Sequence, residues 1–331
     1  MNLVADILEN EILANYPKAL ETLLIDQTSK KNIFWATDNY KVLGNEYSFF
    51  SYILPELITG KNGNVIMPRV KKDKQTQQTR SKNMAEVFTP SWLCNSQNNL
   101  IDNKWFNSEN VFNFELIEDN GFRTWRTNDN KIVFPQNKSW ENYISENRLE
   151  IACGEAPYVV SRYDSTTGDF IPVGNRIGIL DRKLRVVNEN CATKEDWLNA
   201  SENAFKHTYA YEWQGDSLLL SREAMLYTFI ENYSYKFGEL PPIHSIEKVA
   251  YIISWNVWQM DGIKCVIPNS CRFESIAQLF GDEVKTECIG CKTDNVKRHN
   301  GIYSQIKDWK KTNPESGEIG LTIRFIDLIK R

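Results

Sequence analysis

The sequence lacks a long apolar run. Its longest apolar stretch, residues 249–258, is interrupted by Ser254 and Asn256 and is much shorter than a membrane span. The first ten residues are acidic and have no basic region of the kind that opens a signal peptide. We therefore expect a cytoplasmic protein that is not associated with a membrane.

The sequence also lacks an excess of positive charge. The net charge of -4 over 331 residues gives no general reason to expect nucleic-acid binding, although an acidic protein can carry one basic face. Residues 69–82 are the exception, with six basic side chains against Asp73 alone. This segment is either a solvated loop or a segment that contacts phosphate groups.

A disulfide framework is not expected, because the seven cysteines are odd in number and no signal peptide is predicted. Cys288 and Cys291 form a Cys-x-x-Cys knuckle, Cys271 precedes it by seventeen residues, and His299 follows it by eight. Zinc takes four such ligands, so we expect a structural zinc site with His299 or Cys265 as the fourth ligand. A knuckle without metal and a redox pair are the alternatives.

Hydrophobic periodicity predicts an α/β protein. Apolar pairs in residues 3–25, interrupted at Pro17, predict two short helices. Further along the chain, predicted strands alternate with helical patterns, which favours a largely parallel sheet. The predicted strands are 149–152, 176–180 and 209–213, and the predicted helices are a short one through 159–160, one through 186–187, then 221–237 and most of 246–258.

Residues suited to a nucleotide-like ligand follow these strands in order. A ligand at the carboxyl ends of a parallel sheet needs a glycine turn and carboxylates that accept hydrogen bonds from hydroxyl and amino groups. Glu150 and Gly154 belong to the first turn, Asp181 ends the second strand, and Asp216 follows the third.

These stretches, with Phe88-Thr89-Pro90 upstream, resemble the gamma-type adenine-N6 DNA methyltransferases, and more closely the bacterial proteins labelled restriction endonuclease subunit M. The resemblance covers about residues 20–330 and lies in AEVFTPSWLCNSQNN, LEIACGEAPYVVSRYD, GILDRKLRVVNEN and ISWNVWQMDG. It implies a Rossmann-like methyltransferase sheet that binds S-adenosylmethionine. Phe88, Thr89 and Pro90 would lie against the methionine part of this cofactor, and Glu150 and Gly154 would shape the turn that receives it. Asp181 would hold the ribose, and Asp216 would contact the adenine.

The resemblance also implies an organisation and partners. We expect an N-terminal helical segment with a basic loop (1–84), the cofactor-binding core (85–245) and a C-terminal extension (246–331) that is α/β or resembles a zinc ribbon. DNA and a restriction or specificity subunit are the expected partners.

The catalytic motif of this group, Asn/Asp-Pro-Pro-Tyr/Phe, is absent. Methylation of a base requires an acceptor for its amino group and an aromatic ring against which the flipped base stacks. Asn232 and Tyr235 keep the outer residues of the motif, but both prolines are lost, and residues 221–237 also fit a helix. The predicted function is a DNA adenine-N6 methyltransferase-like subunit of a restriction-modification or phage-defence system. The alternatives are an inactive module that binds DNA or protein, and a methyltransferase for another substrate. No convincing nuclease motif is present.

Overall fold

The N-terminal segment forms two short helices, as predicted. The computed structural model describes residues 7, 9–84, 89–276 and 284–329. Helices α1 (Glu9–Asn15) and α2 (Pro17–Leu24) are separated at Pro17, the first residue of α2. The apolar face of α2 is buried and packs on α10 (Ile243–Asn256), which ties the start of the chain to the centre of the fold.

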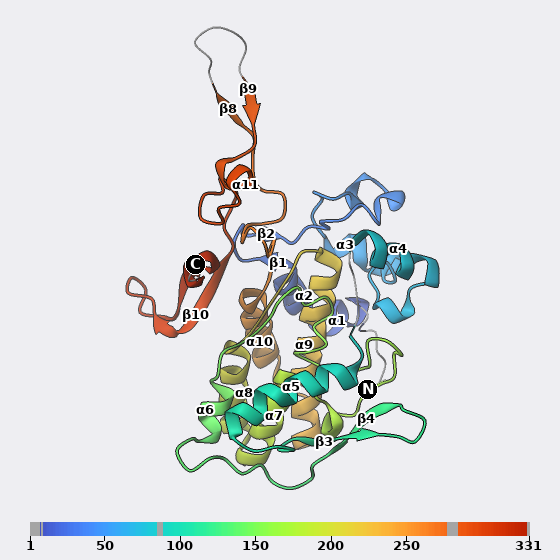
Figure 1. The fold of residues 1–331 in the computed structure, drawn as a ribbon, viewed down its shortest axis with the longest axis vertical. Helices are drawn as coiled ribbons and strands as arrows, with labels where there is room; N and C mark the ends of the chain where they lie inside the picture. Colours follow the sequence, from blue (N-terminus) through green and yellow to red (C-terminus); the bar gives the residue numbers. More distant parts are fainter. Residues whose placement is uncertain (1–6, 8, 85–88, 277–283, 330–331) are drawn as a thin grey trace.

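The central sheet has three parallel strands: β5 (Arg148–Glu150), β6 (Thr208–Glu212) and β7 (Val257–Gln259), in the order β5-β6-β7. Helices α7 (Ile179–Asn190) and α8 (Lys194–Lys206) connect β5 to β6, and α9 (Gly215–Phe237) and α10 connect β6 to β7. Both connections cross the sheet in the same direction, so right-handed crossovers place all four helices on one face. The molecule is therefore a mixed α/β protein with a small sheet (Figure 1).

The strand predicted at residues 176–180 is wrong. A 3₁₀ turn, Val173–Asn175, precedes this stretch, residues 176–178 form no regular element, and α7 begins at Ile179. Gly178 precedes the first turn of α7, and the carboxylate of Asp181 accepts a hydrogen bond from the Gly178 N–H (3.1 Å), which caps the helix. A short apolar run fits a strand or a buried helix equally well, and here Asp181 joins Gly178 and the distant Ser161 at the start of the helix. The short helix predicted through residues 159–160 is absent as well, since this part of the chain forms turns.

The basic segment is helical rather than a loop. Residues Arg69–Lys71 form a 3₁₀ turn and Lys74–Met84 form α4. Two of its cations, Lys72 and Arg80, are buried and form ion pairs with the buried Asp216, at 3.5 and 2.8 Å. Long-range pairing with Asp216 therefore removes part of the segment's charge from solvent.

The remaining strands form small antiparallel hairpins. These are β1–β2 (Ile25–Asp26, Lys31–Asn32), β3–β4 (Asn113–Ile117, Arg123–Thr127), β8–β9 (Glu274–Ile276, Val284–Thr286) and β10–β11 (Gln305–Thr312, Ile319–Arg324). The other helices are α3 (Pro55–Ile58), α5 (Ser91–Phe106), α6 (Trp140–Ile144) and α11 (Ile289–Thr293), with 3₁₀ turns at Lys41–Leu43, Asn45–Tyr47, Gly60–Asn62, Val173–Asn175 and Phe325–Leu328. The β8–β9 hairpin projects from the top of the molecule (Figure 1).

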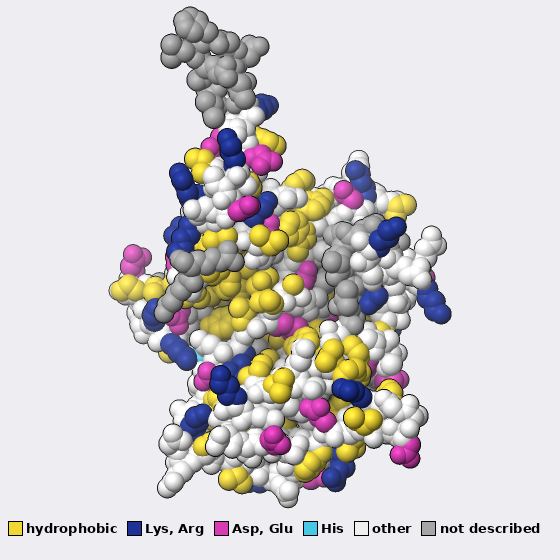
Figure 2. All heavy atoms as spheres, viewed as in Figure 1, with side chains coloured by type: hydrophobic (Ala, Val, Ile, Leu, Met, Phe, Trp, Pro, Cys, Tyr) yellow, Lys and Arg dark blue, Asp and Glu magenta, His cyan; other side chains and the backbone are white. Residues whose placement is uncertain are grey.

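The core extends past the predicted boundary at residue 245, because α10 spans it and β7 belongs to the central sheet. Trp197 and Trp258, on either side of this boundary, are both buried in one hydrophobic cluster. Among the described residues, no helix is long and apolar enough to cross a membrane. On the face shown in Figure 2, hydrophobic side chains gather across the middle, between the projecting hairpin and the helices below.

Candidate functional site

A cavity of about 550 Å³ lies at the carboxyl ends of β5 and β6. Its volume is within the range of small-molecule and cofactor sites, about 300–1,000 Å³. The lining comes from the turn after β5, the end of β6, the first turn of α9 and one side of α5. This is the position at which parallel sheets bind nucleotide-like ligands. The lining residues are Thr89, Gln97, Asn98, Ile101, Leu149, Glu150, Ile151, Ala152, Cys153, Gly154, Glu155, Pro157, Tyr158, Ile179, Glu212, Gln214 and Ser217.

The turn after β5 has an unusual backbone. Ala152, Gly154 and Ala156 all have positive φ, at 48°, 55° and 57°. Glycine adopts this region without penalty, whereas alanine is strained there by about 1–2 kcal/mol. The turn thus presents its backbone to the cavity in a conformation that the surroundings must hold in place.

Glu212 holds this turn and was missed in the sequence. It is the last residue of β6, and its carboxylate accepts hydrogen bonds from the N–H groups of Gly154 (2.8 Å), Trp213 (2.8 Å) and Gln214 (3.2 Å). Burial raises its pKa above the usual value, while these N–H groups oppose the change. Glu212 is thus a carboxylate at the carboxyl end of β6, beside the turn after β5. Asp181 and Asp216 were the carboxylates predicted for this position at the cavity.

Glu150 also lines this cavity. One of its carboxylate oxygens, Oε2, is buried without a hydrogen-bond partner among the described residues. Burial raises the pKa of Glu150 well above its usual value, although N–H groups of Tyr158 and Val159 act in the other direction. The Glu150 carboxyl is therefore held away from solvent beside the cavity. The amide oxygen of Gln214 is likewise buried without a hydrogen-bond partner among the described residues.

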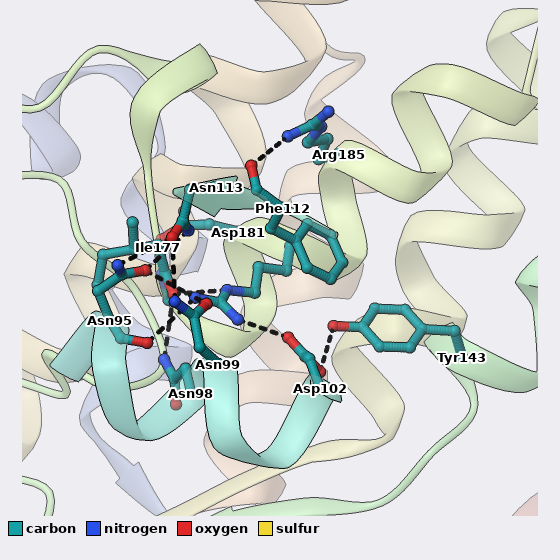
Figure 3. A network of polar contacts seen from close by, with 12 residues as sticks. Asn95, Asn98, Asn99, Asp102, Phe112, Asn113, Tyr143, Ile177, Asp181 and Arg185 are labelled. Carbon is teal, nitrogen blue, oxygen red and sulfur yellow. Dashed lines mark hydrogen bonds and ion pairs between the residues drawn. The ribbon is translucent and has the colours of Figure 1, made fainter. Parts of the chain in front are cut away.

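The wall formed by α5 is anchored to α7 by a buried polar network (Figure 3). At its centre, the guanidinium of Arg182 contacts Asp102 at 2.6 Å and donates to the side-chain oxygens of Asn95 and Asn99, both at 2.8 Å. Asn98, which lines the cavity, donates to the carbonyl of Ile177 at 3.1 Å. These contacts explain why a helix with many asparagines packs inside the protein.

Asp181 and Asp216 do not line the cavity. The carboxylate of Asp181 accepts from the N–H and hydroxyl of Ser161, at 2.8 and 3.0 Å, in addition to Gly178. Asp216 accepts from Tyr40 (2.7 Å) and pairs with the cations of the α4 segment, and although burial opposes it, these cations lower its pKa to about 2. Both carboxylates thus hold loops and helices together beside the cavity.

The predicted residues upstream of α5 are only partly described. Thr89 lines the cavity, and its carbonyl accepts a hydrogen bond from Ser165 at 2.8 Å. Pro90 is the residue before α5, and Phe88 lies outside the described residues. The structure therefore brings Thr89, Glu150 and Gly154 together around one cavity.

Asn232 and Tyr235 lie near the other end of α9. Asn232 is fifteen residues after Ser217, a separation of about 22 Å along the helix. Its side chain is buried, donates to the Thr228 carbonyl (2.9 Å) and accepts from Asn188 (3.1 Å), whereas Tyr235 is exposed. Neither residue can reach a ligand in the cavity, because the helix separates them.

A second site consists of Cys271, Cys288, Cys291 and His299, whose ligand atoms all lie within 4.8 Å of one another. Each Sγ is 3.6 Å from Nδ1 of His299. Metal–ligand lengths of about 2.3 Å to sulfur and 2.1 Å to nitrogen in a tetrahedron give a separation of about 3.6 Å. The cluster could therefore hold a metal ion such as zinc.

Local structure explains how these ligands meet. The β8–β9 hairpin lies between Cys271 and Cys288 and brings them to its base, and Cys288 precedes α11, which carries Cys291. A Cβ on Gly290 would lie 2.6 Å from Nδ1 of His299, so only glycine fits beside the cluster. Cys265 is buried but does not belong to the cluster, whose fourth member is His299.

No protein-family model, curated protein or solved structure matches this chain.

Proposed function

We propose that the strand-end cavity binds S-adenosylmethionine and that the chain is the cofactor-binding subunit of a DNA adenine-N6 methyltransferase-like system. One observation carries the proposal: the same cavity is lined by the glycine turn after β5 and by the carboxylate that ends β6. A glycine turn gives a ligand access to the backbone, and the neighbouring carboxylate suits ribose hydroxyls. The sequence resemblance supplies the identity of the cofactor and of DNA as the substrate.

In this proposal Glu212, not Asp181, accepts hydrogen bonds from the ribose. Gly154 and Glu150, which line the cavity at the turn after β5, would hold the methionine part. When bound, S-adenosylmethionine supplies an activated methyl group. The protein side chains hold and orient it, and α5 shields one side of it from water.

Titration calorimetry with S-adenosylmethionine and its demethylated product tests this proposal. In Glu212→Gln, an amide N–H₂ placed against the N–H of Gly154 disturbs the turn, and the charged acceptor is lost. We expect affinity to fall at least about tenfold, since hydrogen bonds to charged groups are worth about 1.5–3 kcal/mol. The exposed Glu141→Gln is the control. Absence of heat with either ligand, or equal heat in both variants, would refute the proposal.

A second candidate is a module that binds the cofactor but does not methylate DNA alone. The distance of Asn232 from the cavity favours it, because no other residue was predicted to accept the amino group of a base. Transfer of labelled methyl groups to mixed-sequence DNA by the isolated chain would exclude this candidate. Label in protein or RNA would instead change the substrate class.

We also propose that the Cys271, Cys288, Cys291 and His299 cluster binds zinc with a structural role, since all four tetrahedral positions would be filled by protein. Elemental analysis should find about one zinc per chain in wild type. Zinc should be lost in Cys291→Ser and kept in Cys265→Ser. Wild-type protein purified without chelator that is folded and metal-free would contradict this.

A further inference from the structure

The central sheet has one open edge. Among the strands of the described residues, β5 pairs only with β6, by way of contacts such as Arg148 N–H to the His207 carbonyl (3.1 Å). In a strand, the backbone groups of alternate residues point to opposite sides, so those of Leu149 face away from β6. An edge of this kind offers a row of N–H and C=O groups to another strand.

Apolar side chains at this edge are exposed. Leu149 is 43% exposed, and Ile151, two residues further, is 66% exposed. Leu149 lies on the sheet face opposite the four crossover helices, because it is in register with Tyr209, which contacts the C-terminal hairpin on that face. The C-terminal hairpin and Phe325 cover Tyr209 and Trp258 on this face but leave the β5 side uncovered.

A groove of about 360 Å³ continues from this edge, between the sheet face and the C-terminal hairpin. Its apolar lining includes Leu149, Trp258 and Phe325. Three cations, Arg148, Lys310 and Lys311, line it against the single carboxylate of Asp308. The groove thus favours binding of an apolar segment. A negative charge on that segment would lie beside the amino end of β5, where the cations are.

We propose that an extended segment of a partner polypeptide adds a strand to β5 and fills this groove. The partner strand carries an acidic residue toward Arg148, Lys310 and Lys311, and its apolar side chains cover Leu149 and Ile151. This mode of recognition combines backbone hydrogen bonds with side-chain contacts in a groove.

The direction of the added strand has a consequence that rests on the proposed function. If it runs parallel to β5, its carboxyl end reaches the mouth of the strand-end cavity, because Leu149 lines both the groove and the cavity. Residues after that strand could then supply the base acceptor and the aromatic ring that Asn232 and Tyr235 are too distant to provide.

The probe is a fluorescent peptide of about ten residues, the length of a short strand and a turn. It begins with an acidic residue, continues with alternating Val and Ile, and ends in Asn-Pro-Pro-Tyr. We expect saturable binding, with affinity at least about tenfold lower in Ile151→Lys, which loses a buried apolar contact. Lys310→Glu, outside the cavity, should also weaken binding. Val133→Lys is the matched control, since Val133 is 83% exposed and lines neither groove nor cavity.

Strand addition should protect the Leu149 and Ile151 amides from hydrogen exchange, and a peptide with alternate N-methylated amides should not bind. Absence of saturable binding, or equal affinity in wild type and Ile151→Lys, overturns the proposal. A wild-type dimer that Ile151→Lys dissociates also overturns it, because a second copy would then fill the edge. Cofactor titration is performed without the peptide. Loss of cofactor binding, which would refute the proposed function, is therefore measured independently of peptide binding.

Discussion

Replacing Arg182 by leucine removes the centre of the network that holds α5 against α7. The side chain of Arg182 is fully buried, and its guanidinium contacts Asp102 at 2.6 Å. Without it, the Tyr143 hydroxyl, at 3.0 Å, is the one donor that Asp102 keeps among the residues that the structure describes. The side-chain oxygens of Asn95 and Asn99 each lose a donor, and so does the carbonyl of Ile177 (3.0 Å).

The expected loss of stability is about 3–5 kcal/mol, because removal of one partner leaves a buried charge uncompensated. This is a large part of a total of about 5–15 kcal/mol. With an m-value of about 3 kcal/mol/M, the urea midpoint should fall by more than about 1 M. The variant Arg324→Leu removes an exposed ion pair with Asp327 and should leave the midpoint within error.

Urea unfolding followed by circular dichroism measures both variants, and a double-mutant cycle with Asp102→Leu isolates the pair. We expect a coupling of about 1–3 kcal/mol, with the double variant more stable than the sum of the single losses predicts. If Arg182→Leu and Arg324→Leu shift the midpoint equally, the network does not anchor α5, and the reasoning is refuted.

Three further predictions follow from single residues. Burial lowers the pKa of His207 from 6.5 to about 4, so between these values the unfolded chain binds the proton and the folded chain does not. The free energy of unfolding should therefore decrease as pH falls from about 6.5 to about 4, and urea titrations of His207→Gln should show a flatter decrease. Ala152→Gly relieves a positive φ at an exposed position and should stabilise the protein by up to about 1 kcal/mol. Gly154→Ala should destabilise it. A lower free energy of unfolding in Ala152→Gly would contradict the strained turn. Asn232→Ala should leave the calorimetric affinity for S-adenosylmethionine unchanged, and a tenfold loss would contradict the separation of about 22 Å.

The sequence predicted the parts of the fold that depend on local patterns. Pro17 separates two short helices, and the apolar runs before Glu150 and Glu212 are strands that pair in parallel. The Cys-x-x-Cys knuckle indicated a metal cluster for a similar reason, since two ligands close in sequence are close in space. The choice between Cys265 and His299 needed the fold of the hairpin, because both lie within reach along the chain.

Predictions failed where a distant residue decides the local structure. Lys72 and Arg80 looked solvated because their partner, Asp216, is far away in sequence. Residues 176–180 looked like a strand because the hydrogen bond from Ser161 to Asp181 is not visible in the sequence. Asp181 was assigned to the cavity because it would end that strand. Without the strand, this assignment is wrong as well.

Glu212 could have been found from the period of its strand. Side chains alternate between the two faces of a strand, so Glu212 shares a face with Ala210, which is fully buried against the crossover helices. A carboxylate on the buried face at the last position of a strand needs donors, and the donors here include the N–H of Gly154 in the turn after the neighbouring strand. Glu212 therefore links the ends of β5 and β6 before any ligand is bound. A ligand hydroxyl that reaches this carboxylate shares it with the glycine turn, so a change at either position should alter binding at both.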